Sequence, residues 1–142
     1  MNKLLFLNAV FYCLFLWCNN LAAQTQTKVH QSFNLDGLKN ITIDISYPYD
    51  VEIWDGNTVL LETSIDLDNA PPNLVKMFLE TGRYKVLQQL NTNEVKFNLQ
   101  PISRREVLTS KGTCVENISM TFYIPKDVTT QTLGNFTKSS IK

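Results

Sequence analysis

The sequence predicts an all-β fold of antiparallel hairpins that form a sandwich or a curled sheet, with one short helix and an end that could open a β-solenoid. Three observations support this prediction. Long runs alternate apolar and polar residues, turn-forming residues separate these runs, and one stretch has apolar residues at helical spacing. Of the 142 residues 44% are hydrophobic, which is enough apolar material for a core.

The clearest alternation covers residues 41–53, where odd positions are apolar or aromatic and even positions are polar or proline. An extended chain turns these two sets to opposite faces, so we expect one buried and one solvated face. Pro48 lacks a backbone N–H but does not change the phase of the run. We therefore expect a bend or bulge at a sheet edge there, and the isomer of the Tyr47–Pro48 bond stays open.

The next alternating run, residues 59–67, is expected to pair with the long run as a hairpin. A two-residue turn would place Glu62 among the buried residues, whereas the three-residue turn 55–57 keeps that face apolar. Either Gly56 or Asn57 would supply the positive φ of this turn. The resulting pairs are Ile53 with Val59, Val51 with Leu61, Tyr49 with Thr63, and Tyr47 with Ile65.

A short helix is predicted over residues 73–82, after two prolines that end the preceding strand. Apolar residues recur at the spacing of one helical face, as Leu74 with Phe78 and Val75 with Leu79. Asn73 is a candidate for the N-terminal cap, and Gly82 lies where a C-terminal cap belongs. We expect this helix to cover one end of the sheet.

A second hairpin follows, because residues 84–90 and 95–99 alternate on either side of a polar turn. Placing the apolar residues on one face pairs Leu90 with Val95 and Val86 with Leu99. Residues 101–117 read as a long loop or a short irregular strand, and alternation returns at 118–124.

The predicted domain organisation begins with an export signal at residues 1–23, in which an apolar run follows Lys3. A polar leader at 24–32 and a single β-rich domain at 33–142 follow, with a poorly defined tail from about 126. The apolar run is short for a membrane span, so a transmembrane interpretation comes second, and no stable span is expected once the signal is removed. The expected location is periplasmic, outer-surface or secreted.

Composition and motifs favour no chemistry. Basic and acidic residues number 13 each, so no net charge attracts nucleic acid. Cleavage after Ala23 leaves Cys114 without a disulfide partner, and no motif of a nucleophile or metal site occurs. We expect no catalytic residue, cofactor or metal site. The polar groups that were weighed and assigned to solvated surface are Asp44, Asp50, Glu52, Glu62, the 66–69 stretch, His30, Arg104, Arg105 and Lys111.

Trp54 is the best candidate for a ligand contact, because it lies at an even, outward position beside a turn. Exposed aromatic rings bind sugars and peptides, and Tyr47 and Tyr49 are expected to point inward. A lone exposed ring or an edge cover is the alternative role for Trp54.

Five motifs occur in a recognisable order: Ala22-Ala23-Gln24, residues 33–45, residues 51–57, Gly82-Arg83-Tyr84, and Phe122-Tyr123-Ile124-Pro125. Over roughly residues 33–136 this order resembles bacterial secreted adhesin-like domains of the autotransporter-adhesin head type. The resemblance implies that residues 133–136 open a rung of a β-solenoid. It implies no catalytic residues.

Three functional hypotheses follow from these patterns. The first is a non-enzymatic exported β domain of the bacterial cell envelope with an adhesin-like role, contacting a protein or glycan partner. The second is a small glycan- or ligand-binding module that uses Trp54. The third is the N-terminal part of a longer adhesin-like protein. The sequence does not indicate the oligomeric state.

Overall fold

The computed structural model describes the backbone of residues 26–136 and the side chains of residues 26–130. The predicted export signal, residues 1–23, lies outside the described residues. Within the described part, no helix is long and apolar enough to cross a membrane. The elements are β1 (Thr27–Phe33), β2 (Asn40–Trp54), β3 (Val59–Asp68), α2 (Leu74–Glu80), β4 (Val86–Leu90), β5 (Val95–Leu99), β6 (Leu108–Thr109), β7 (Gly112–Thr113), β8 (Val115–Pro125) and β9 (Thr129–Phe136).

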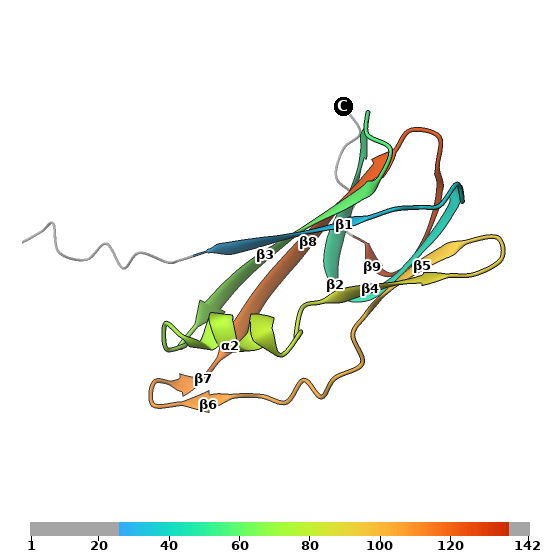
Figure 1. Ribbon diagram of the computed structural model, residues 1–142. Helices are drawn as coiled ribbons and strands as arrows, with labels where there is room; N and C mark the ends of the chain where they lie inside the picture. Colours follow the sequence, from blue (N-terminus) through green and yellow to red (C-terminus); the bar gives the residue numbers. More distant parts are fainter. Residues whose placement is uncertain (1–25, 137–142) are drawn as a thin grey trace, which may run out of the picture.

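The main sheet has seven strands and curls into a nearly closed, barrel-like shape (Figure 1). Its order is β1-β3-β8-β2-β5-β4, and β9 pairs with β2 outside this path. The pairs of β2 with β5, β8 and β9 are parallel, whereas β1 with β3, β3 with β8 and β4 with β5 are antiparallel. The mainly β class with a short helix is therefore confirmed, but the strands are not a simple series of hairpins.

The predicted pairing of β2 with β3 is wrong, because β8 lies between these two strands. Val51 is opposite Phe122 of β8, and Phe122 is opposite Leu61 of β3. Tyr49, Met120 and Thr63 form the neighbouring row in the same way. These rows retain the predicted phase with one strand inserted. Alternation sets which face a residue occupies, but β8 alternates equally well and competes for the same partners.

The bend predicted at Pro48 is confirmed, since the register of β2 against β9 shifts between Ile45 and Tyr49. Its expected place at a sheet edge is wrong, because β2 has neighbours on both sides. Pro48 falls where pairing is interrupted, so its missing N–H removes no regular ladder bond. The described residues contain no cis peptide bond. At the end of β2 the odd-position Ile53 is 52% exposed, contrary to the predicted inward face.

Helix α2 confirms the predicted helix and its packing stripe. Leu74 and Phe78 are buried. Gly82 has φ +73° and donates its N–H to the Leu79 carbonyl, while Arg83 N–H reaches the Phe78 carbonyl. This pair of bonds is a Schellman motif, which glycine favours because the left-handed conformation strains other residues. At the other end Asn73 makes no side-chain capping bond.

The second hairpin is confirmed in the predicted register, with Val86 opposite Leu99 and Leu90 opposite Val95 in β4 and β5. Asn91 N–H closes the turn on the Glu94 carbonyl at 2.9 Å. Each strand has only five residues, so the short turn and the alternation of apolar residues are enough to determine this register.

The segments at the two ends of the described chain differ from the prediction. The leader, expected to be loose, supplies most of β1, which pairs with β3 from Thr27 opposite Ile65 to Phe33 opposite Val59. The poorly defined tail contains β9, which pairs in parallel with the first half of β2. Both segments consist mostly of polar residues. Each becomes a strand because its backbone forms ladder hydrogen bonds with an apolar neighbouring strand.

Candidate functional site

The two edge strands of the sheet, β1 and β4, meet at a seam that side chains close. The Gln31 amide donates to the Val86 carbonyl at 3.0 Å, and its oxygen accepts from the Val86 N–H at 3.1 Å. Gln88 donates in the other direction, to the Asn34 carbonyl of the segment after β1. Amide side chains therefore replace a backbone ladder, and the two edges need not run side by side along their whole length.

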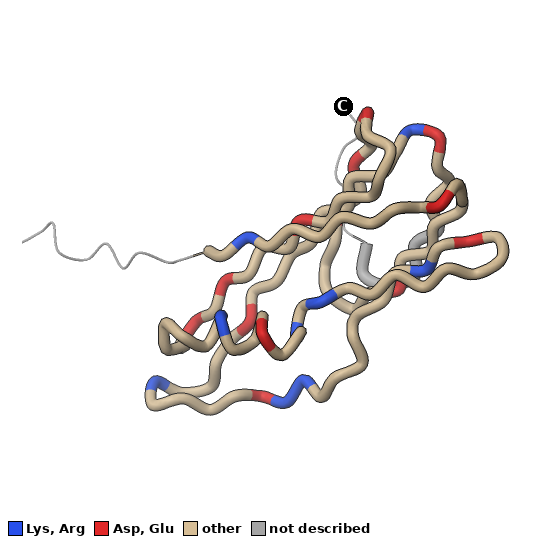
Figure 2. Tube along the Cα trace, in the orientation of Figure 1, with Lys and Arg blue, Asp and Glu red and all other residues tan. Residues whose placement is uncertain are grey.

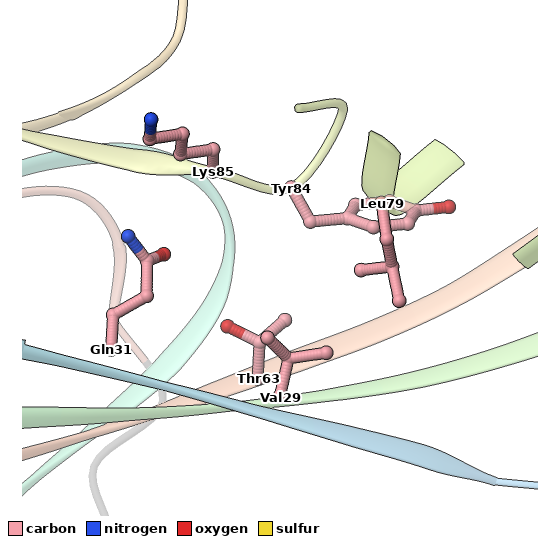
Figure 3. A pocket seen from close by; sticks show the side chains of 6 residues that line it. All are labelled: Val29, Gln31, Thr63, Leu79, Tyr84 and Lys85. Carbon is pink, nitrogen blue, oxygen red and sulfur yellow. The ribbon is translucent and has the colours of Figure 1, made fainter. Parts of the chain in front are cut away.

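A cavity of about 280 Å³ lies at this seam, where β1 and β4 separate (Figure 3). We call it the seam pocket. Figure 3 shows the side chains of Val29, Leu79 and Tyr84 around the space. The lining residues are Val29 and Gln31 of β1, Thr63 of β3, Leu79 of α2, and Tyr84 and Lys85 of the segment before β4. Apolar walls with a few polar groups are typical of small-molecule sites.

Two polar groups of the seam pocket have no partner in the described part of the chain. The Thr63 hydroxyl oxygen is drawn on the side of the cavity facing Gln31, and Thr63 is only 3% exposed. Lys85 is exposed at the rim and is the cationic residue of the lining. Both groups can therefore contact water or a ligand.

A buried polar cluster, formed by Arg83, Tyr84 and Glu116, lies on the other side of the Tyr84 ring. Arg83 donates to both Glu116 carboxylate oxygens, at 2.6 Å from Nη2 and 3.0 Å from Nε. The Tyr84 hydroxyl donates to Glu116 at 2.7 Å. Arg83 also lies 4.5 Å from the centre of the Phe78 ring and donates to the Arg105 carbonyl. The cluster joins the end of α2, the 100–107 loop and the start of β8.

Charge and burial shift the pKa values of this cluster in opposite directions. Burial raises the Glu116 pKa, but the hydrogen bonds from Arg83 and Tyr84 outweigh it, so the net shift is downward. Burial and the hydrogen bond to Glu116 both raise the Tyr84 pKa far above its usual value. Glu116 therefore stays ionised and Tyr84 stays protonated, and neither exchanges protons near neutral pH.

Trp54, the residue predicted to contact a ligand, is half-buried against its own turn. Its indole N–H donates to the Thr58 carbonyl at 3.0 Å, and its ring covers Gly56 so closely that an added Cβ would lie 2.1 Å from it. Neither Gly56 nor Asn57 has a positive φ, so that expectation is wrong and glycine is needed for space instead. The structure thus places Trp54 as a cover of the loop.

Two of the four outward carboxylates predicted to be solvated form surface ion pairs. Asp44 contacts Lys96 at 2.7 Å, and Glu62 contacts Lys28 at 2.7 Å and His30 at 3.0 Å. The hydrogen bond from Lys28, aided by that from His30, lowers the Glu62 pKa. Glu52 is exposed, while Asp50 is half-buried with one oxygen unsatisfied. Acidic and basic residues are interspersed over the fold (Figure 2).

The remaining candidates are dispersed. Asp68 accepts from Asn117 at 3.0 Å, and the described residues hold no group of three acidic, His or Cys side chains that could bind a metal ion. Arg104 donates to the carbonyls of Arg83 and Gln100, so it fixes the 100–107 loop. Cys114 is buried, and burial raises its thiol pKa. A thiol in this environment is a poor nucleophile.

A second, shallow hollow of about 410 Å³ lies beside the β4–β5 turn and is lined by Asn40, Ile41, Thr42 and residues 91–94. Its polar groups bond to one another: Asn40 donates to the Asn93 carbonyl and Thr42 to Glu94. No aromatic ring lines it. It is therefore a weaker candidate than the seam pocket for glycan or ligand binding.

Sequence reasoning missed the residues that form the site. Gln31 lay in the predicted leader, Tyr84 was assigned to a strand of the second hairpin, and Arg83 entered only as part of a family-like motif. One signal was available: an arginine, a tyrosine and a glutamate flank apolar runs at 83, 84 and 116, where burial would require them to pair. Their proximity depends on β8 lying beside β2, which no local pattern indicates.

The fold and its site define a mainly β, barrel-like protein with a small apolar pocket at the junction of its edge strands. No protein-family model and no curated protein matches this chain.

Proposed function

We propose that this chain is an exported, non-enzymatic β domain that acts by binding, and that the seam pocket is where it binds a small ligand. The observation that carries the proposal is the seam pocket itself, an apolar cavity of about 280 Å³ whose lining includes one cationic residue, Lys85. The apolar run at residues 1–23 supports the export part.

The state of the buried ionisable groups supports a non-enzymatic role. A general base needs a free lone pair near its substrate and a pKa near the working pH. Glu116, the best-buried carboxylate near the seam pocket, already accepts from Arg83 and Tyr84, and its pKa is lowered. These groups hold the scaffold together and leave the pocket to a binding role.

Titration with N-phenyl-1-naphthylamine, a neutral apolar dye that fluoresces when bound, tests this proposal. We expect saturable binding to residues 24–142 with one site. Val29→Phe, which adds a ring inside the cavity, should weaken binding at least about tenfold, or 1.4 kcal/mol. The matched control Val115→Phe changes a valine that is 48% exposed on β8 and should bind as wild type does.

Two results would overturn the proposal: no saturable binding by the wild type, or equal binding by Val29→Phe and the wild type. Urea unfolding of each variant shows whether it is folded at the assay temperature. If Val29→Phe does not fold, Leu79→Trp fills the same cavity from α2, where Leu79 is half-buried.

The adhesin-like role is a second candidate. The parallel pairing of β9 with β2 favours it, because successive rungs of a β-solenoid also pair in parallel. Sequencing the gene beyond the codon for Lys142 tests this candidate. An in-frame continuation with repeated short strands supports the hypothesis that this chain is the N-terminal part of a longer adhesin-like protein, and an immediate stop codon contradicts that hypothesis.

A further inference from the structure

We infer that the seam pocket takes an amphipathic carboxylate, a small acid whose apolar tail enters the cavity and whose carboxylate meets Lys85 at the rim. This inference rests on the proposed function and adds the chemical class of the ligand. It follows from two features of the pocket: its apolar walls and its charge.

The walls and volume of the seam pocket determine the polarity and length of the ligand's tail. Val29, Leu79 and the ring of Tyr84 present apolar surface, while the Tyr84 hydroxyl is engaged outside the cavity by Glu116. A water molecule occupies about 30 Å³ in the liquid. A cavity of about 280 Å³ therefore has room for roughly nine such volumes. A chain of eight to ten carbons is about the right size, at ~0.8 kcal/mol per buried methylene.

The charge comes from Lys85, which differs from most lysines of the described chain. Lys28, Lys39, Lys76, Lys96 and Lys126 each form an ion pair with an aspartate or glutamate. Lys85 and Lys111 lack an acidic partner within residues 26–136, and of these two only Lys85 lines the pocket. The lining contains no carboxylate, so an anionic headgroup meets attraction and no like charge.

The geometry of the rim suits such a headgroup. In Figure 3 the Lys85 ammonium extends away from the apolar side chains, and the residue is exposed. A flexible four-carbon stem can turn toward a carboxylate at the mouth while the head stays hydrated. A neutral or cationic headgroup would leave Lys85 unpaired or repelled.

Displacement of the bound dye by decanoate, decanol and decyltrimethylammonium tests the inference, because the three share a tail and differ in charge. All three are used below their micelle-forming concentrations. We expect decanoate to bind about fivefold more tightly than decanol, because an exposed ion pair contributes about 1 kcal/mol. The cation should bind least tightly. The preference should shrink in high salt.

Lys85→Met keeps the apolar stem and removes the charge, so it should abolish the preference for decanoate over decanol. Lys111→Met removes the other unpaired lysine and should leave that preference unchanged. Urea midpoints confirm that each variant is folded.

The outcomes separate this inference from the proposed function. Equal binding of decanoate and decanol, or a preference that survives in Lys85→Met, overturns the carboxylate assignment and leaves the seam pocket as a binding site. Failure of all three compounds and of the dye to bind overturns both. Tighter binding of the cation than of decanoate likewise overturns the carboxylate assignment and leaves the seam pocket as a binding site.

Discussion

Tyr84 separates two regions with polar groups, which differ in whether those groups form hydrogen bonds within the protein. On one side its hydroxyl joins the buried polar cluster, where both oxygens of Glu116 accept bonds and Arg83 donates to three acceptors. On the other side its ring faces the seam pocket, where the hydroxyl of Thr63 has no partner in the described structure and Lys85 has no counter-ion. The two regions share an aromatic ring and little else.

The contrast distinguishes a structural polar group from a binding one. A buried charge is tolerated when every hydrogen bond is made, and such a group has nothing left to offer a ligand. Lys85, which has no acidic partner within the described residues and lies beside an apolar pocket, retains that capacity. Removing members of the cluster should therefore cost stability, whereas changes at Lys85 should affect ligand preference.

The largest loss is expected for Glu116→Gln, which leaves the Arg83 guanidinium buried without a counter-charge. Breaking one partner of a buried pair costs about 3 kcal/mol of unfolding free energy. Urea denaturation followed by circular dichroism measures it. Glu80→Gln is the matched control, because Glu80 pairs with Lys76 at 3.8 Å on the exposed face of α2 and should lose less than about 0.5 kcal/mol.

Acid should reduce the difference between the wild type and Glu116→Gln. The folded-state pKa of Glu116 lies below its ordinary value of 4.5, so its contribution is fully present above that pH. The contribution is lost as the pH falls through the folded pKa. A difference that stays constant from neutral pH to the lowest pH at which both proteins fold would show that the Glu116 charge is not the stabilising feature.

A smaller loss, about 2 kcal/mol, is expected for Gln31→Ala, since two hydrogen bonds to the Val86 backbone disappear. Hydrogen exchange at the Val86 amide should accelerate, because the seam opens there first. Gln89→Ala provides the control, as Gln89 is exposed on β4. Unchanged protection of Val86 in Gln31→Ala would mean that the seam is held by packing alone.

The smallest loss, about 1 kcal/mol, is expected for Tyr84→Phe, which removes the hydroxyl and keeps the ring. The measurement is again the urea midpoint. Tyr123→Phe serves as its control, because Tyr123 is half-buried on β8 and its hydroxyl makes no hydrogen bond within residues 26–130. A loss for Tyr84→Phe as large as for Glu116→Gln would show that Tyr84, more than Arg83, holds the carboxylate.

Local patterns predicted the parts of the fold that depend on neighbouring residues. The β4–β5 register and the helix with its glycine cap follow from turns and spacings within about ten residues. The partner of β2 could not be predicted in this way. Three strands with the same alternation were available, and the choice of β8 depends on how the whole sheet curls.

The candidate site shows the same limit. Trp54 was predicted to contact a ligand because its even position in the alternating run faces outward, yet its ring covers Gly56. The lining of the seam pocket comes from β1, β3, α2 and the segment before β4, separated by more than fifty residues in the sequence. Of these, Val29 and Gln31 belonged to the predicted polar leader.

By itself, the sequence determined which face most residues of the alternating strands turn to the core, where the helix ends and how the second hairpin pairs. A period of two and a left-handed glycine act within a few bonds. Only the tertiary structure decided that β8 separates β2 from β3, that Gln31 closes the seam, and that Arg83 meets Glu116. These contacts join segments distant in the chain, and the cooperative burial of the complete sheet selects them.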